Sequence, residues 1–228
     1  MEYLCYDDFG RHQSIDQIRE VNDMTREEIL TIAKPILFNT EMVRAILEGR
    51  KTTTRRILKL PKHIKKQENG LYTLFADGTC YENQHLEEIV DYIKQPYKLG
   101  DYLYVRETWA NVNTLVCPCY YYRASEELPD WALGGWKPSI HMPKQAARIF
   151  LRVTDVRVER LNDITEEEAV KEGLYKGWHY LHTSSLAVTA KQAFMWLWDM
   201  TIKLKYRHKY GWIANPWVWV IEFERVED

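Results

Sequence analysis

The clearest alternation of apolar and polar positions lies in residues 147–160, where the period of two is typical of a β-strand. The first apolar series comprises Ala147, Ile149, Leu151 and Val153. The apolar positions then change phase and continue at Val156 and Val158. A phase change inside one strand predicts a bulge or a bend, as at the corner of a barrel.

The rest of the pattern predicts short strands separated by a few helices. We expect strands at 34–40, 51–58, 102–109, 119–124 and 216–226, and a hairpin that turns at Asp77-Gly78. We expect helices at 14–33, 40–50, 84–94, 165–174 and 190–203. Because short strands outnumber helices, this pattern favours a mainly β, α+β fold: a small closed β-barrel with helices packed at its ends.

Capping residues mark where two of these helices begin and end. We expect Thr40 to cap the helix at 40–50 and Gly49 to end it. Thr165 and Glu168 have the spacing of a capping box, and Gly173 ends that helix. Because apolar residues within 14–33 recur at helical spacing, residues 1–34 are interpreted as an N-terminal helical extension, and residues 35–228 as the main domain.

Composition and charge exclude several classes of protein. The chain has 228 residues, 46% of them hydrophobic and 28% charged, which excludes a disordered, collagen-like or disulfide-scaffold protein. It has no apolar run long enough for a membrane span and no basic-then-apolar leader at its start, so we expect a soluble cytoplasmic protein. The 31 basic and 33 acidic residues argue against a histone-like positive coat but allow a local basic groove.

The cysteines give little support for a metal centre. They are Cys5, Cys80, Cys117 and Cys119. The C-P-C spacing is tighter than that of a CxxC zinc knuckle, and no second half follows it. We interpret them as reduced thiols, with a metal site as the alternative.

The segment GRKTTTRR at 49–56 is the first candidate for chemistry. One interpretation is a solvated basic edge strand. The other is a cluster of cations beside a hydroxyl, which can hold a phosphate or activate Thr54 as a nucleophile. Lys51 can act as a base only if burial or nearby cations lower its pKa, and Arg55 and Arg56 are candidates for that effect.

Two further segments carry candidate binding residues. In VRETW at 105–109, Arg106, Glu107 and Trp109 form either a binding surface or an ordinary ion pair beside a core tryptophan. In WKPSIHMP at 136–143, two prolines stiffen a loop, which makes the loop a candidate pocket wall. The candidates in this loop are Trp136, Ser139 and His141.

Glu172 is the candidate in the acidic helix at 165–174. It lies in the last turn, near the negative end of the helix dipole, where a carboxylate is disfavoured. A residue kept at an unfavourable position is a candidate for function.

The order of these motifs resembles the ASCH domain, a relative of the RNA-binding PUA domain. The resemblance rests on GRKTxTxR, LGDxLxVRE, the long xVTxVxVxxL strand with its TEEEAxxEG helix, and the terminal WVxxIEF strand. Residues 35–226 are similar to ASCH proteins carried by phages and prophages. The resemblance implies a PUA-like β-barrel with a cleft beside the first helix, and binding of RNA or a nucleoside.

One enzymatic branch that the sequence resembles is the N4-acetylcytidine amidohydrolases. The resemblance implies that Lys51 takes the proton of Thr54, that the Thr54 oxygen attacks the acyl carbonyl on cytosine N4, and that Glu172 positions the base or shuttles protons. It implies no metal and no cofactor. The partner is then a nucleoside, a nucleotide or RNA, and no membrane is involved.

The chain departs from that branch by insertions at about 59–97, 110–145 and 174–212. They contain basic and aromatic residues that can contact a nucleic-acid backbone or stack on bases: Lys62, Lys65, Lys66, Trp131, Trp136 and Trp178. Three alternatives to the hydrolase stay open: a binding module for RNA or a modified base, a nuclease for single-stranded RNA, and a structural phage accessory protein. The acyl group and the oligomeric state also stay open.

Overall fold

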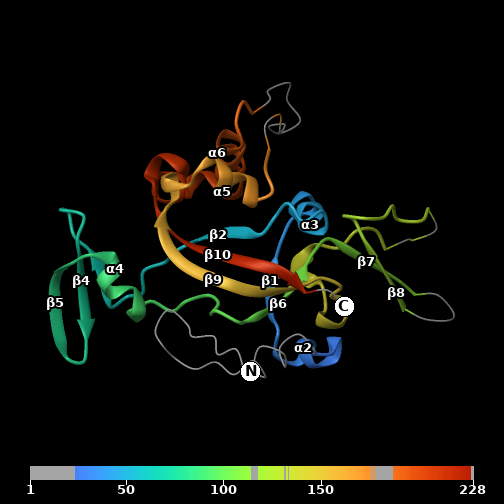
Figure 1. The fold of residues 1–228 in the computed structure, drawn as a ribbon, viewed down its shortest axis with the longest axis horizontal. Helices are drawn as coiled ribbons and strands as arrows, with labels where there is room; N and C mark the ends of the chain where they lie inside the picture. The colour runs from blue at the N-terminus through green and yellow to red at the C-terminus, as the bar shows by residue number, and fades with distance from the viewer. Residues whose placement is uncertain are drawn as a thin grey trace, which may run out of the picture.

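The longest strands of the protein lie at the centre of a five-stranded sheet with the order β1-β6-β9-β10-β2. The computed structural model (Figure 1) describes residues 24–113, 118–130, 132, 134–175, 177 and 187–226. The sheet comprises β1 (Lys34–Leu37), β2 (Thr53–Ile57), β6 (Tyr102–Arg106), β9 (Phe150–Arg160) and β10 (Trp217–Val226). β1 is parallel to β6, and the other pairs are antiparallel. The expected α+β, mainly β composition is confirmed.

The predicted bulge is present in β9. The pairing of β9 with β10 shifts register between Glu222 and Phe223, which pair with Asp155 and Val153, so Thr154 lies between the two paired positions. The extra residue moves later side chains to the other face, which explains the phase change in the sequence. The strand begins at Phe150 rather than at 147.

The helices that flank the central sheet begin at capping residues. α3 (Thr40–Leu47) is capped by Asn39, whose side chain accepts a hydrogen bond from the Met42 amide. The prediction that Thr40 caps α3 is therefore wrong by one residue, since Asn39 already supplies the acceptor that the first turn needs. α5 (Glu166–Lys171) has the predicted capping box at Thr165, and α2 (Arg26–Ile32) has one at Thr25.

The predicted closure of the barrel is not confirmed. Among the described residues, β1 and β2 are the two edges of the central sheet, and no backbone ladder joins them. A side chain spans the gap instead: Arg56 Nη2 on β2 donates to the Leu37 carbonyl on β1, at 2.9 Å. The strong curvature of β9 and β10 (Figure 1) brings these edges to the same side of the molecule.

The segments expected to be insertions form smaller units around this sheet. A three-stranded sheet contains β3 (Ile64–Lys66), β4 (Tyr72–Ala76) and β5 (Thr79–Gln84). Its predicted turn at Asp77-Gly78 is confirmed, with positive φ at both residues. The helix expected at 84–94 is shorter: α4 (Leu86–Ile89) is followed by a 3-10 turn at Val90–Tyr92.

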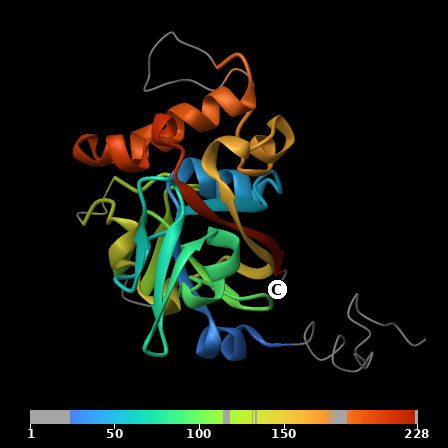
Figure 2. The same cartoon turned by 90° about the vertical axis from the view of Figure 1, so that its left-hand side faces the viewer.

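The strand expected at 102–109 is divided into two. β6 ends at Arg106, and β7 (Trp109–Asn113) pairs with β8 (Pro118–Tyr122) in a separate hairpin. The segment at 174–212, also expected to be an insertion, contributes α6 (Ala190–Thr201) and α7 (Arg207–Tyr210). Figure 2 shows α6 on one side of the central sheet and α2 on the opposite side.

The main core lies on the central sheet, and a second apolar cluster gathers around Trp109, Met142 and Phe150. Within the described part of the chain, no helix is long and apolar enough to cross a membrane. The first half of the helix expected at 14–33, together with Cys5, Cys117, Trp131 and Trp178, lies outside the described residues.

Candidate functional site

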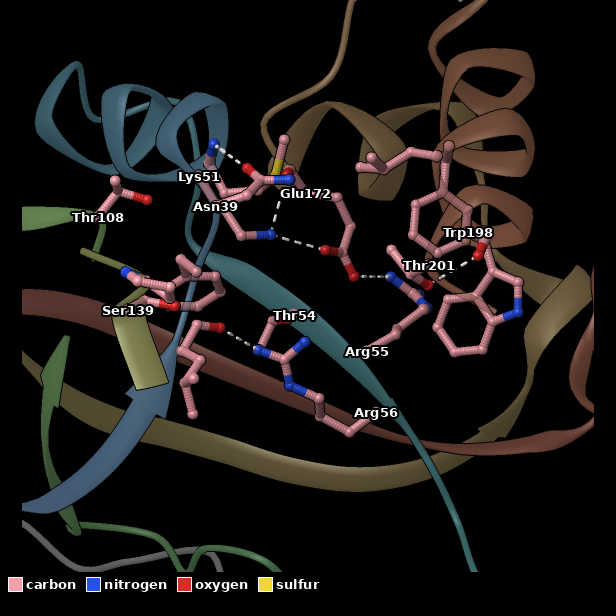
Figure 3. Close-up of a pocket in the computed structure, with 16 residues that line it drawn as sticks. Asn39, Lys51, Thr54, Arg55, Arg56, Thr108, Ser139, Glu172, Trp198 and Thr201 are labelled. Carbon is pink, nitrogen blue, oxygen red and sulfur yellow. Dashed lines mark hydrogen bonds and ion pairs between the residues drawn. The ribbon is translucent and has the colours of Figure 1, made fainter. Parts of the chain in front are cut away.

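A cavity of about 430 Å³ lies where β1, β2, α6 and the end of α5 meet (Figure 3). This volume is within the range of small-molecule sites. Its polar lining includes six of the residues selected from the sequence: Lys51, Thr54, Arg55, Arg56, Ser139 and Glu172. The cavity therefore joins residues that lie more than a hundred positions apart in the chain.

Lys51 is buried at the base of the cavity, with 3% of its surface exposed. Its Nζ donates to Glu172 Oε2 at 2.7 Å, to the Thr53 carbonyl at 2.7 Å and to the Glu172 carbonyl at 2.9 Å. The ammonium also lies 5.4 Å from the centre of the Phe38 ring. All three ammonium protons thus have acceptors, and Figure 3 shows the side chain held against Glu172.

The backbone around Gly173 brings Lys51 and Glu172 together. Both Arg50 and Lys51 donate their amides to the Ala45 carbonyl, which turns the chain sharply at the end of α3. Gly173 has φ of +90°, and a Cβ there would lie 2.8 Å from Ala45 Cβ and 3.1 Å from Lys51 Cβ. Only glycine allows α5 to end this close to α3.

The pKa of Lys51 is lowered from its ordinary value of 10.5, chiefly because burial disfavours the charged form. The charge of Glu172 and its hydrogen bond act in the opposite direction. The cations of Arg56 and Arg55 lower the pKa further, as smaller contributions. The net direction is the one that a general base requires.

Thr54 lies on β2 and lines the same cavity, with 3% of its surface exposed. No hydrogen bond joins its hydroxyl to another residue in the part of the chain that the structure describes, Lys51 included. The hydroxyl is therefore available to a ligand. In many enzymes the bond between nucleophile and base tightens only when substrate binds.

Glu172 caps the C-terminus of α5 and is held from two sides. Lys51 binds one carboxylate oxygen, and Arg55 Nη1 lies 3.4 Å from the other. These two cations offset the unfavourable position at the negative end of the helix. Glu172 thus lies at the C-terminus of α5, as the sequence predicted, and two cations compensate for that position.

Arg55 continues the charge network away from the cavity. Its buried guanidinium binds Glu159 at 3.1 Å and Glu168 at 3.0 Å. Burial raises the pKa of Glu168, but the Thr165 amide and the cations of Arg55 and Arg157 lower it below its ordinary value. The network fixes the orientation of Arg55 and, through it, of Glu172.

The remaining predicted binding residues do not line this cavity: Arg106, Glu107, Trp109, Trp136 and His141. Arg106 donates to the Ile140 carbonyl. Glu107 is buried in a two-bond ion pair with Arg148, at 2.9 and 3.0 Å. Trp109 packs in the second apolar cluster, as the alternative interpretation expected, but Glu107 pairs with Arg148 rather than with Arg106.

The sequence analysis missed the apolar wall of the cavity. On α6 it consists of Phe194, Leu197, Trp198 and Thr201. These positions have the spacing i, i+3, i+4 and i+7, which places them on one helix face, and this was the available signal. Near β1 the missed residues are Leu37, Phe38, Asn39 and Met42.

Among the described residues, no group of three or more histidine, cysteine or acidic side chains is placed to hold a metal ion. Comparison of the chain with protein-family models, with curated proteins and with solved structures finds no match. Function is therefore argued from the geometry and chemistry of the cavity.

Proposed function

We propose that the protein is an amidohydrolase that removes the acyl group from N4-acylated cytosine nucleosides or nucleotides. The observation that carries this proposal is the buried Lys51–Glu172 pair beside the unpaired Thr54 hydroxyl in one cavity. A base of lowered pKa beside a free hydroxyl is the arrangement that an activated nucleophile needs. The proposal includes a PUA-like barrel in which Arg56 spans the seam between β1 and β2.

In the proposed reaction, neutral Lys51 takes the hydroxyl proton of Thr54, and the Thr54 oxygen attacks the acyl carbonyl carbon. The bond from that carbon to cytosine N4 then breaks, and N4 takes the proton from the Lys51 ammonium. Water attacks the resulting threonine ester with Lys51 again as base, which releases a carboxylic acid and regenerates Thr54. The net reaction converts an amide and water into an amine and a carboxylic acid.

The other side chains have supporting roles in this proposal. Glu172, held by Lys51 and Arg55, orients the amine and stabilises it when it is charged. Phe194 and Trp198 supply an apolar wall suited to a flat base, and they keep water from the acyl group.

The alternative is a module that binds a modified base without turnover. The observation that favours it is the complete set of acceptors around Lys51. These acceptors hold the ammonium in place and stabilise its protonated form, which cannot act as a base. The two functions differ in one measurable respect, namely whether product forms.

The sharpest test is Thr54→Val, because valine has nearly the shape of threonine and the lost hydroxyl has no described partner. The variant and the wild type would be given N4-acetylcytosine as base, nucleoside and nucleotide, and products would be separated by chromatography. We expect Thr54→Val to lose at least about 10³-fold in turnover, as in other enzymes that lose their nucleophile, while its unfolding midpoint stays near that of the wild type.

Thr53→Val is the matched control. Thr53 is the neighbouring residue of β2, is 1% exposed, and has a buried hydroxyl without a described partner, but it does not line the cavity. We expect it to keep wild-type turnover. Full turnover by Thr54→Val would refute the nucleophile. No turnover by the wild type, with tight binding of the substrates, would establish the binding module instead.

A further inference from the structure

A second cavity, of about 390 Å³, lies just beyond the end of β2, where two of the insertions meet the central sheet. It is bordered by Leu58 after β2, by Lys66 and Tyr72 of the three-stranded sheet, and by Tyr210 of α7. Figure 1 shows the three-stranded sheet at one end of the central sheet. We propose that this cavity binds a nucleotide, with its phosphate on the basic side chains and its base on the aromatic ones.

The charge of the cavity is the first argument. Four cations line it: Lys59, Lys66, Arg160 and Lys209. No carboxylate lines it, and none of the four cations forms an ion pair with a carboxylate of the described residues. Four uncompensated positive charges around one hollow attract an anion, and low-dielectric walls strengthen that attraction.

The aromatic side chains are the second argument. Trp217 is fixed by a hydrogen bond from its Nε1 to the Tyr72 hydroxyl, at 2.9 Å. The Arg160 guanidinium lies 4.2 Å from the centre of the Trp217 ring and donates to the Asn215 carbonyl at 3.1 Å. A guanidinium held over an indole offers a platform on which a base stacks, and Tyr210 supplies a second flat surface.

The cations and the aromatic rings together favour a nucleotide over other anions as the ligand. A simple phosphate would use the cations alone, whereas flat rings beside the cations match a ligand with both a phosphate and a base. A free nucleotide and one unit of a single-stranded chain share this chemistry. The proposal does not rest on the proposed hydrolase, since binding here is measured without turnover.

Neighbouring lysines of β3 provide a matched pair for the test. Lys66 lines the cavity, whereas Lys65 Nζ lies 5.3 Å from the centre of the Phe75 ring and does not line it. Adjacent strand residues point to opposite faces, and both lysines are exposed. Lys66→Gln and Lys65→Gln therefore change net charge equally without disturbing the core.

The experiment measures binding of adenosine 5′-monophosphate and adenosine by calorimetry, and of fluorescently labelled hexaadenylate by anisotropy. Adenine probes are chosen because they are not substrates of the proposed hydrolase. We expect Lys66→Gln and Lys209→Gln each to weaken binding of a phosphate-bearing probe about tenfold, as the loss of one hydrogen bond to a charged group predicts. Lys65→Gln should bind as the wild type does.

Binding of the mononucleotide would identify a free nucleotide as sufficient, and binding of hexaadenylate alone would identify a single strand as the source; both outcomes support the site. Equal loss in Lys65→Gln and Lys66→Gln would overturn it, because the attraction would then be diffuse. Binding of adenosine as tight as that of its monophosphate would overturn the phosphate subsite. The absence of binding by every probe would overturn the proposal as a whole.

Discussion

The first cavity lies along β2 and the second just beyond its end, and most of their cations differ in whether a carboxylate pairs with them. In the first, Lys51 and Arg55 are buried and share the carboxylate of Glu172, whereas Arg56 donates to the Leu37 carbonyl and forms no ion pair with a described carboxylate. In the second, Lys66 and Lys209 are exposed and have no described carboxylate partner. The comparison shows that a count of basic residues does not identify an anion site; the placement of carboxylates decides which cations remain free for a ligand.

The difference has an energetic basis. A buried cation must be paired, because an isolated charge in a low-dielectric interior costs several kcal/mol. An exposed cation stays solvated and can remain unpaired until a ligand arrives. Under the two proposals, the first cavity, with Lys51 and Arg55 paired, acts on an uncharged group such as an amide, and the second binds an anion.

The largest expected effect comes from Glu172→Gln, which removes the shared carboxylate from the first cavity. The substitution leaves Lys51 and Arg55 buried without the carboxylate that they share. Removing one partner of a buried pair costs about 3–5 kcal/mol. We expect a loss of that size in the free energy of unfolding, measured by urea denaturation.

Lys209→Gln in the second cavity is the comparison variant, and we expect it to change stability by less than about 0.5 kcal/mol, as is usual for surface positions. The double variant Lys51→Met/Glu172→Gln should lose less than the sum of its single variants, because it leaves one fewer unpaired charge. A loss under about 1 kcal/mol for Glu172→Gln would contradict the view that the pair is buried and interdependent.

The second prediction tests whether the backbone at Gly173 positions Lys51 and Glu172 in the first cavity. Gly173→Ala combines a positive φ with a Cβ that would lie 2.8 Å from Ala45 Cβ, so α5 must move away from Lys51. Gly177→Ala is the matched control, since Gly177 also has φ of +90° but its added Cβ would meet no atom of the described residues within 4 Å. We expect the control to lose about 1–2 kcal/mol from backbone strain alone.

Gly173→Ala should lose clearly more than the control, and its hydrolase activity should fall as well because Lys51 is displaced. Thermal denaturation and the deacylation assay measure the two effects. Equal losses of stability in the two variants would contradict this prediction, because they would show that α3 and α5 can separate at Gly173 without a loss of unfolding free energy.

The fold was predictable where one local pattern determines it. The phase change near Val153 indicated the bulge, and Asp77-Gly78 indicated the hairpin, because both are consequences of strand period and turn conformation. Closure of the sheet is different. It depends on how the edge strands β1 and β2 meet. No local pattern near Leu37 or Arg56 indicates that a side-chain hydrogen bond, rather than backbone pairing, joins these two strands.

The site was predictable only in its polar part. Lys51, Thr54 and Glu172 were selected from motif positions, and the structure brings them to one cavity. The neutralisation of Lys51 and Arg55 by a shared carboxylate was not predictable, since it depends on contacts across more than a hundred residues. Of the four cations of the second cavity, the sequence analysis selected only Lys66 as a possible nucleic-acid contact, because the cations come from separate segments.

The third prediction concerns the pH dependence of the hydrolase. The pKa of Lys51 is lowered from 10.5, chiefly by burial, and Lys51 must be neutral to accept the Thr54 proton. Turnover efficiency should therefore rise about tenfold per pH unit below that pKa and level off at a pH below 10.5. Because the Arg56 cation also lowers this pKa, Arg56→Gln should move the midpoint upward, and Arg56→Lys should move it less. A profile that is flat or falls with pH would contradict Lys51 as the base.

The smallest expected effect distinguishes the cavities by salt. Each phosphate neutralised by a free cation releases counterions, so log Kd for hexaadenylate should rise linearly with log salt. Lys66→Gln should reduce that slope by about 1, and Lys65→Gln should leave it unchanged. The Michaelis constant for N4-acetylcytidine should hardly change over the same salt range, because this nucleoside carries no phosphate. A slope that Lys66→Gln leaves unchanged would mean that this exposed cation neutralises no phosphate, and the contrast between the cavities would then fail.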